Sequence, residues 1–313
     1  MKAIVLTQPG GVENLQLTTV EKPKVARDGV LIRVKAISIN PVDWKTRKGT
    51  GVYGRLKELN PLIIGWDVSG VVESVGEDVV AFKPGDEVFG MINFPGHGQA
   101  YAEYVAAPAH HLALKPANIS HEEAAAATLA ALTAWQVLVT YGNVQAGQKV
   151  LIHAAAGGVG HYGVQIAKYL GANVIGTSSA AKKAMVMDLG ADEHIDYTTQ
   201  KFEELVQDAD LVFDTVGGEN FVRSLDAVKP HGWVISIPSG MSGDIEAQAK
   251  AKGVNARAML VESNGKDMQI LAGLLANGKM KSLINSVYPF EQMGAAHIEL
   301  EQGRATGKII VKL

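Results

Sequence analysis

The stretch VLIHAAAGGVGHYGVQIAKYLGA, residues 150–172, decides the fold. Its apolar start extends the predicted strand over 149–154, and the run after the glycines predicts a helix over 158–170. A strand that passes through a glycine-rich loop directly into a helix is the context in which a glycine pattern becomes informative.

The loop itself carries the pattern Ala155-x-Gly157-x-x-Gly160, with alanine in place of the usual first glycine. Gly157 would let the backbone approach a pyrophosphate, and Gly160 would allow close packing of helix on strand. Main-chain amides at the helix start, including those of Gly158 and Val159, would face the phosphates. This pattern predicts a dinucleotide site, and the alternative is a glycine-rich turn that only connects two packed elements.

Strands and helices alternate on both sides of this loop. Further strands are predicted over 173–178, 194–197, 210–216 and 232–238, and a helix over 181–189 follows the first of them. A helix is also predicted to start at Ser120, because Glu123 completes a capping box. The alternation predicts a Rossmann, doubly wound α/β domain with a parallel sheet over residues 121–265.

The first 120 residues are different. Val- and Ile-rich segments over 2–6, 29–39, 68–76 and 86–92 predict short strands in a mostly β domain. After a helix over about 266–277, the terminal segment GKIIVKL predicts a strand that returns to this domain. With 313 residues the chain is long enough for two domains, which we predict over 1–120 with 266–313 and over 121–265.

The second strand of the predicted Rossmann domain bears on the choice of dinucleotide. NAD sites place an acidic residue about 20 positions after the glycines, but no Asp or Glu occurs between residues 171 and 187. The segment instead offers hydroxyls and cations suited to a 2′-phosphate: Thr177, Ser178, Ser179, Lys182 and Lys183. NADPH is therefore favoured, although the two lysines also fit a solvated helix face.

Composition excludes several other classes of protein. The net charge of −3 gives no electrostatic reason to expect nucleic acid or anionic lipid as a partner. Cysteine is absent, which excludes disulfides, thiolate nucleophiles and cysteine-ligated zinc. The N-terminal apolar stretch is too short for a signal peptide and the longest small-apolar run is too short to span a membrane, so we expect a cytoplasmic protein.

Several stretches in order, over essentially the whole chain, resemble the medium-chain dehydrogenase/reductase superfamily. They are AISINPVDWKTRKG, GWDVSGVVESVG, FKPGDEVFG, LAALTAWQVL, HAAAGGVG, LGADEHIDY and GKIIVKL. Within that superfamily the chain is most similar to zinc-free quinone oxidoreductases and NADPH-dependent alkenal/one oxidoreductases. The resemblance implies a GroES-like catalytic domain beside the Rossmann domain, and a homodimer.

The resemblance also locates the positions at which zinc-dependent members bind their catalytic metal. Here these positions carry Asn40, Trp66 and a residue near Leu129. An indole N–H is only a donor and cannot replace an imidazole ligand. The nine histidines are scattered, and we expect the adjacent pair His110–His111 to point in opposite directions on a strand. We therefore expect no catalytic metal.

Two residues are the predicted catalytic candidates. By resemblance, Asn40 lies beside the nicotinamide, where its amide would hydrogen-bond a ribose or a substrate carbonyl, although an Asn–Pro turn also explains it. Tyr53 lies on a Gly-flanked loop and would donate a proton to the acceptor. It would equally suit an apolar pocket as a loop aromatic, in which case water would supply the proton.

Other positions are predicted to hold the cofactor. Thr133 matches the family position against the nicotinamide ring, and a buried Thr on an Ala-rich helix is the alternative. Tyr197 resembles the family aromatic near the adenine, and Lys308 would approach the cofactor from the terminal strand or lie on the surface. Strand ends contribute main-chain groups at Val216, Ile237 and Leu260.

The expected reaction is hydride transfer from NADPH to a small-molecule quinone or α,β-unsaturated carbonyl, because such acceptors need no Lewis acid. One alternative is an enoyl-thioester reductase, and another is a protein that binds NADPH without catalysis. The sequence does not identify the physiological acceptor.

Overall fold

The computed structural model describes residues 1–238 and 240–313. The chain divides into two compact units, residues 1–132 with 262–313 and residues 133–261. Helix α4 (Leu129–Trp135) crosses the first division. The predicted domains met at residues 120 and 265, so the two divisions differ mainly at the helical segment that follows Ser120. The assignment of a catalytic role to one unit and a cofactor role to the other stays a prediction.

The second unit is built on a parallel sheet. Its strands are β8 (Lys149–Ile152), β9 (Asn173–Ser178), β10 (Glu193–Asp196), β11 (Ala209–Asp214), β12 (Val228–Ser236) and β13 (Asn255–Ala258). They lie in the order β10-β9-β8-β11-β12-β13, and every neighbouring pair is parallel. Counted along the chain this is 3-2-1-4-5-6, the Rossmann order, which confirms the predicted fold.

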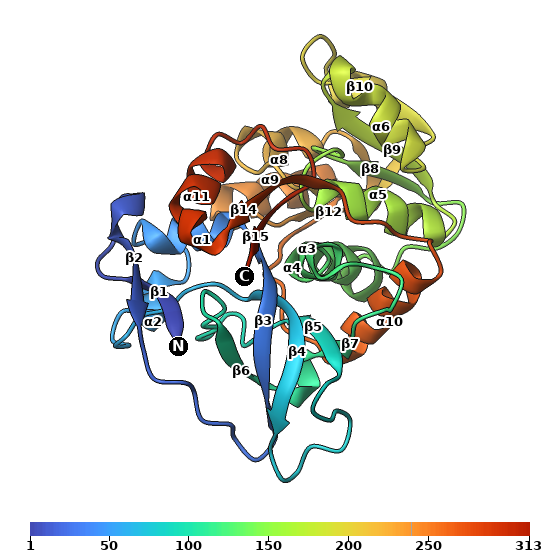
Figure 1. Cartoon of the computed structure of the whole chain (residues 1–313). Helices are drawn as coiled ribbons and strands as arrows, with labels where there is room; N and C mark the ends of the chain where they lie inside the picture. Colours follow the sequence, from blue (N-terminus) through green and yellow to red (C-terminus); the bar gives the residue numbers. More distant parts are fainter. Residues whose placement is uncertain (239) are drawn as a thin grey trace. The chain divides into compact units, whose positions relative to one another are not determined.

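Helices connect these strands, as right-handed crossovers between parallel strands require. They are α5 (Gly160–Tyr169), a 3₁₀ turn (Ala180–Lys182), α6 (Lys183–Asp188), α7 (Phe202–Leu205), α8 (Glu219–Ser224) and α9 (Gly243–Lys252), while a π-helical segment (Gln136–Tyr141) precedes β8. Apolar residues of the strands and helices form one core cluster that includes Leu151, Val212, Phe221 and Val234. Figure 1 shows α5 and α6 beside β8, β9 and β10.

The first unit is mostly β. Its strands are β1 (Lys2–Leu6), β2 (Leu15–Thr19), β3 (Gly29–Ile39), β4 (Asp67–Val75), β5 (Glu87–Met91), β6 (Tyr104–Pro108), β7 (Ala113–Leu114), β14 (Ile284–Pro289) and β15 (Lys308–Lys312). The larger sheet has the order β14-β15-β3-β4-β5-β7, with β6 also paired to β3. Strand β1 pairs with β2, and its Ala3 forms a single antiparallel bridge to Ala102. Strand β15 is antiparallel to β3, as Figure 1 also shows, which confirms that the terminal strand returns to the first unit.

Short helices of this unit were not all visible in the sequence. They are α1 (Pro41–Arg47), α2 (Tyr53–Leu56), α3 (His121–Ala126), α10 (Gly265–Ala276) and α11 (Met293–Glu301), with 3₁₀ turns at Val12–Asn14, Ala109–His111 and Phe290–Gln292. Only α3 and α10 were predicted. Helix α1 has Pro41 in its first turn, where the missing N–H costs no hydrogen bond. One or two turns are too short to show a helical period.

The helix predicted from Ser120 onward is interrupted. Its capping box is present, because the Ser120 hydroxyl accepts from Glu123 N and the Glu123 carboxylate accepts from Ser120 N. After α3, however, Thr128 Oγ1 donates to Ala125 O at 2.7 Å, and Leu129 N donates to Asp67 Oδ1 at 3.0 Å. The buried carboxyl group of Asp67, from a distant strand, thus accepts a hydrogen bond from the main-chain N–H of Leu129. Helix α4 begins at this residue.

The expectation for the histidine pair was wrong. His110 and His111 lie in a 3₁₀ turn, and their ring centroids are 4.3 Å apart. Such a turn places neighbouring side chains on adjacent faces, unlike a strand. Within residues 1–238 and 240–313, no helix is both long enough and apolar enough to cross a membrane.

Candidate active site

The predicted cofactor residues of the second unit lie along one edge of its sheet. Parallel strands bring their carboxyl ends to the same edge, where doubly wound folds bind ligands. In sheet order, the residues that follow these ends are Tyr197 after β10, Ser178 and Ser179 at the end of β9, the glycine loop after β8, Val216 after β11, Ile237 after β12 and Leu260 after β13. Residues separated by more than 100 positions are therefore placed in one row.

The glycine loop has the features that a pyrophosphate requires. No described residue accepts a hydrogen bond from the main-chain N–H groups of Gly158, Val159 or Gly160. A Cβ at Gly160 would lie 2.2 Å from the carbonyl oxygen of Ala154, so only glycine fits. The main-chain N–H of Ala155 donates to Thr177 O at 2.8 Å, which ties the start of the loop to the neighbouring strand. Donors without an acceptor at the start of α5 fit a bound phosphate.

The loop is also close-packed against the second strand. A Cβ at Gly176 in β9 would lie 2.9 Å from Ala155 Cβ and 2.7 Å from a methyl of Val186 in α6. At Gly157 a Cβ would approach the carbonyl oxygen of Ala154 to 3.1 Å. Glycine at these positions therefore sets how closely loop, strand and helix approach.

Hydroxyls at the end of β9 have different environments. Thr177 is buried, and its Oγ1 lies 3.2 Å from Nδ1 of His153 in the core. Ser178 Oγ lies 2.8 Å from Nε2 of His194 and donates to Ser179 O at 3.1 Å. Thr177 thus contacts the core side of the glycine loop. Ser178 and Ser179 lie together at the end of the strand.

Two lysines, Lys182 and Lys183, come shortly after the end of β9. Lys182 ends the 3₁₀ turn and is half-buried, and Lys183 begins α6 and is exposed. Lys183 forms no ion pair with any residue that the structure describes. Burial lowers the pKa of His153 in the core to about 4, so this imidazole is neutral. The cations of this region are therefore at the exposed end of β9 rather than in the core.

Large apolar side chains are exposed on both sides of the glycine loop. Tyr197 is 61% exposed, Val216 54% and Leu260 49%, whereas Ile237 is half-buried. Exposed apolar groups at the carboxyl edge of a parallel sheet suit the flat faces of adenine and nicotinamide. Thr133, predicted against the nicotinamide, is buried on α4 with 3% of its surface exposed.

The predicted residues of the first unit meet in a buried polar network. Lys308 Nζ donates to Asn40 Oδ1 and to Ile39 O, the latter at 3.2 Å. Asn40 Nδ2 donates to Asp67 Oδ2 at 2.7 Å, and Asn40 N donates to Asp43 Oδ2 at 2.7 Å. Asn40 and Lys308 are thus in direct contact, although 268 positions separate them. Both polar atoms of the Asn40 amide are already committed inside this unit.

Burial dominates the electrostatics of this network. It raises the pKa of Asp43 to about 8, although the hydrogen bond from Asn40 N opposes the shift. It also raises the pKa of Asp67, against the opposing charge of Lys308. The same burial lowers the pKa of Lys308, and the charges of Asp67 and Asp43 oppose that shift. Two carboxyl groups thus share one ammonium group.

A second pair of buried groups adjoins Asp43. Tyr101 interacts with the Asp43 carboxyl group, and its Oη lies 2.9 Å from Nε2 of His297 on α11. Burial and the nearby Arg47 charge lower the pKa of His297 to about 3, so this imidazole is neutral. Sequence reasoning missed Tyr101 and His297, because nothing local connects two residues 196 positions apart.

Trp66 stands at one of the superfamily's metal-ligand positions. It is fully buried, its Nε1 donates to Gly96 O at 2.7 Å, and its ring makes an edge contact with Phe94. Leu129, near another ligand position, has an aliphatic side chain, and its main-chain N donates to Asp67 Oδ1. Among the described residues, no three His, Cys, Asp or Glu side chains gather closely enough to hold a metal ion.

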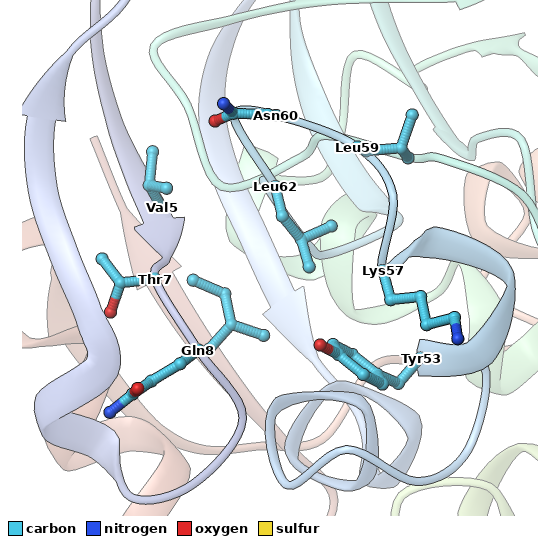
Figure 2. A pocket seen from close by; sticks show the side chains of 9 residues that line it. Val5, Thr7, Gln8, Tyr53, Lys57, Leu59, Asn60 and Leu62 are labelled. Carbon is cyan, nitrogen blue, oxygen red and sulfur yellow. The ribbon is translucent and has the colours of Figure 1, made fainter.

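Tyr53, the other predicted catalytic residue, lines a pocket of about 430 Å³ within the first unit. Figure 2 shows its phenolic oxygen directed into the pocket, with Gln8 on the opposite wall. The two walls are joined by a hydrogen bond from Leu6 N to Leu62 O at 2.8 Å. None of the lining residues is acidic; they are Val5, Leu6, Thr7, Gln8, Tyr53, Lys57, Leu59, Asn60 and Leu62. The volume is in the usual range for a small-molecule pocket.

Two family descriptions match the chain. Residues 26–117 match the alcohol dehydrogenase GroES-like domain, and residues 189–311 match the zinc-binding dehydrogenase family. The tomato (Solanum lycopersicum) 2-methylene-furan-3-one reductase is 37% identical, over 99% of this chain and 79% of that protein. The chain belongs to the medium-chain dehydrogenase/reductase superfamily. The resemblance read from the sequence is confirmed, and with it the GroES-like and Rossmann folds.

Another relative is the chloroplastic NADPH-dependent alkenal/one oxidoreductase of Arabidopsis thaliana, 34% identical over 99% of this chain and 79% of that protein. Among solved structures, the quinone oxidoreductase from Coxiella burnetii is 37% identical with a TM-score of 0.94, and covers 100% of this chain and 99% of its own. A mycobacterial protein solved with NADPH is 29% identical with a TM-score of 0.89 and full coverage of both chains.

Proposed function

We propose that this protein is an NADPH-dependent reductase of quinones and α,β-unsaturated carbonyl compounds. The proposal rests on the strand ends that line one edge of the second unit's sheet. At this edge, three main-chain N–H groups have no hydrogen-bond acceptor among the described residues. Relatives named as alkenal/one, furanone and quinone reductases support the acceptor class. When bound, the cofactor supplies a hydride from C4 of its nicotinamide.

The preference for NADPH over NADH is supported by chemistry at the end of β9. Ser178, Ser179, Lys182 and Lys183 supply hydroxyls and cations, and no acidic residue occupies the place where NAD sites hold the ribose. A relative named as NADPH-dependent and a neighbour solved with NADPH point the same way. We assign the 2′-phosphate to this group and the pyrophosphate to the amides of residues 158–160.

Tyr53 is the proposed proton donor. Its hydroxyl is directed into a pocket without acidic side chains, where the carbonyl oxygen of an acceptor gains negative charge as hydride arrives. Asn40 and Lys308 do not line this pocket; Lys308 donates to Asn40 and Asn40 donates to Asp67, which fixes both side chains. We assign them the role of orienting the nicotinamide ribose and the acceptor rather than transferring a proton.

The proposal includes no metal. Trp66 and Leu129 offer no ligand atom to a metal, and the chain has no cysteine, although one matching family is described as zinc-binding. A quinone or enone accepts hydride without the Lewis acid that alcohol oxidation requires. Cytoplasmic location and assembly as a homodimer stay predictions.

The test is NADPH oxidation by the purified protein with a panel of benzoquinones, enones, enals and crotonyl thioesters. We expect turnover with quinones or enones and little with the thioester. Faster turnover of the thioester would support the enoyl-thioester alternative. Tight NADPH binding without turnover on any acceptor would support a protein that only binds the cofactor.

A further inference from the structure

His194 lies in the group proposed for the 2′-phosphate, although no sequence pattern marks it. Strands β9 and β10 are parallel neighbours, with His194 paired to Gly176 and Asp196 paired to Ser178. Residues 176 and 178 of a strand point to the same face, so the imidazole extends along this face to the strand end. There its Nε2 lies 2.8 Å from Ser178 Oγ.

The charged groups around this imidazole come from two elements. Lys183 at the start of α6 faces it with a positive charge, and Asp196 on its own strand faces it with a negative one. Burial and Lys183 lower the pKa of His194, whereas Asp196 opposes them. Asp196 is itself occupied, because its Oδ1 accepts from the main-chain N and the hydroxyl of Thr198 at 3.0 and 2.7 Å.

Resting on the proposed function, we propose that His194 selects NADPH over NADH by holding the Ser178 hydroxyl toward the 2′-phosphate. Ser178 Oγ donates its one O–H to Ser179 O, so it is the imidazole N–H that donates to Ser178 Oγ. Held in this way, the serine O–H would turn from Ser179 O to a phosphate oxygen when NADPH binds. The half-buried ring is held by this contact with Ser178, which is itself buried. His194 is therefore a positioning residue for cofactor choice and takes no part in hydride transfer.

A bound 2′-phosphate also changes the charge on His194. The dianion favours the protonated imidazole, so NADPH binding takes up a proton and strengthens as pH falls toward the ordinary pKa of histidine. NADH carries a neutral hydroxyl at that position and gives no such effect. Because the phosphate has its own pKa near 6, the wild-type protein must be compared with a variant that cannot titrate.

The experiment measures dissociation constants of NADPH and NADH by calorimetry at pH 6.5 and 8. The variants are His194→Val, which removes the donor, and His194→Gln, which keeps an N–H donor without a titratable group. A control is His231→Asn, because His231 is an exposed histidine of the same unit at a left-handed position that Asn tolerates. Thermal unfolding checks that each variant is folded.

We expect His194→Val to weaken NADPH binding about tenfold, because Ser178 is then no longer held in place to donate to the charged phosphate, and we expect NADH binding to be unchanged. His194→Gln should keep most of the affinity at pH 8 but lose the strengthening at pH 6.5. Equal weakening of both nucleotides, or wild-type pH dependence in His194→Gln, would overturn the inference while leaving the proposed function intact. If the wild-type protein bound no NADPH, the proposed function and this inference would both fail.

Discussion

Replacing Lys308 with methionine tests the buried network of the first unit. Lys308 is 4% exposed, and its ammonium group is the cation that opposes the charges of Asp67 and Asp43. Methionine keeps an apolar side chain of similar reach but removes the charge and the donors to Asn40 and Ile39. Asp43 is already mostly protonated at pH 7, since its pKa is about 8. The uncompensated charge in the variant is therefore that of Asp67.

The size of the effect follows from the ability of Asp67 to take up a proton. Keeping the buried carboxyl group of Asp67 neutral costs about 1.36 kcal/mol for each pH unit above its ordinary pKa of 3.8. The loss of stability is therefore at most about 4 kcal/mol at pH 7 and about 1.6 kcal/mol at pH 5. Removing one partner of a buried pair typically costs about 3–5 kcal/mol, which agrees with this limit. Since the pKa is raised in the folded state, the loss grows as pH rises.

Urea unfolding at pH 5, 6 and 7 measures this loss as a difference in free energy of unfolding from the wild type. The control is Lys312→Met on the same strand, because Lys312 is exposed and pairs with Glu122 at the surface, so we expect a loss below about 1 kcal/mol. Adding Asp67→Asn to the Lys308 variant should recover most of the stability. A loss below about 1 kcal/mol at pH 7, or a loss independent of pH, would refute the account of this network.

Three further predictions concern single side chains. Gly160→Ala should weaken NADPH binding at least about tenfold, because its Cβ would collide with Ala154 O, whereas Gly273→Ala, with no atom within 4 Å, should bind NADPH as the wild type does in calorimetry. Tyr53→Phe should lower kcat about tenfold or more while NADPH affinity is kept; an unchanged kcat in stopped-flow assays would favour water as the proton donor. His297→Gln should make the free energy of unfolding less dependent on pH below pH 6.5. In the wild type the pKa of His297 is about 3 in the folded state and 6.5 in the unfolded state, so the free energy of unfolding falls by about 1.36 kcal/mol for each pH unit between these values as pH is lowered. Parallel urea curves for wild type and variant from pH 6 to 4 would contradict this last prediction.

Much of the fold could be predicted because its signals are local. The capping box at Ser120 and the strand–glycine loop–helix at residues 150–172 each depend on a few neighbouring residues. Alternation of strands with helices then determines the parallel sheet, whose strand order brings the predicted cofactor residues to one edge. The missed helix α1 and strand β14 are short, and the period of a short element is hard to detect.

The rest depends on contacts between distant segments. Asp67 accepts a hydrogen bond from the main-chain N–H of Leu129, and this contact interrupts a helix that the local sequence favours. Lys308 reaches Asn40 only because β15 pairs with β3, and His194 reaches Ser178 only because β10 pairs with β9 in a given register. Neither register can be derived from one sequence, since each is set by the packing of the whole sheet.

Hydride transfer is most directly tested with NADPH that carries deuterium at the transferred C4 position. A single turnover with an enone in ordinary water should place one deuterium on the β-carbon of the product and a solvent proton on the α-carbon, as seen by mass spectrometry and NMR. Product without deuterium at the β-carbon, or consumption of enone without oxidation of NADPH, would contradict the account.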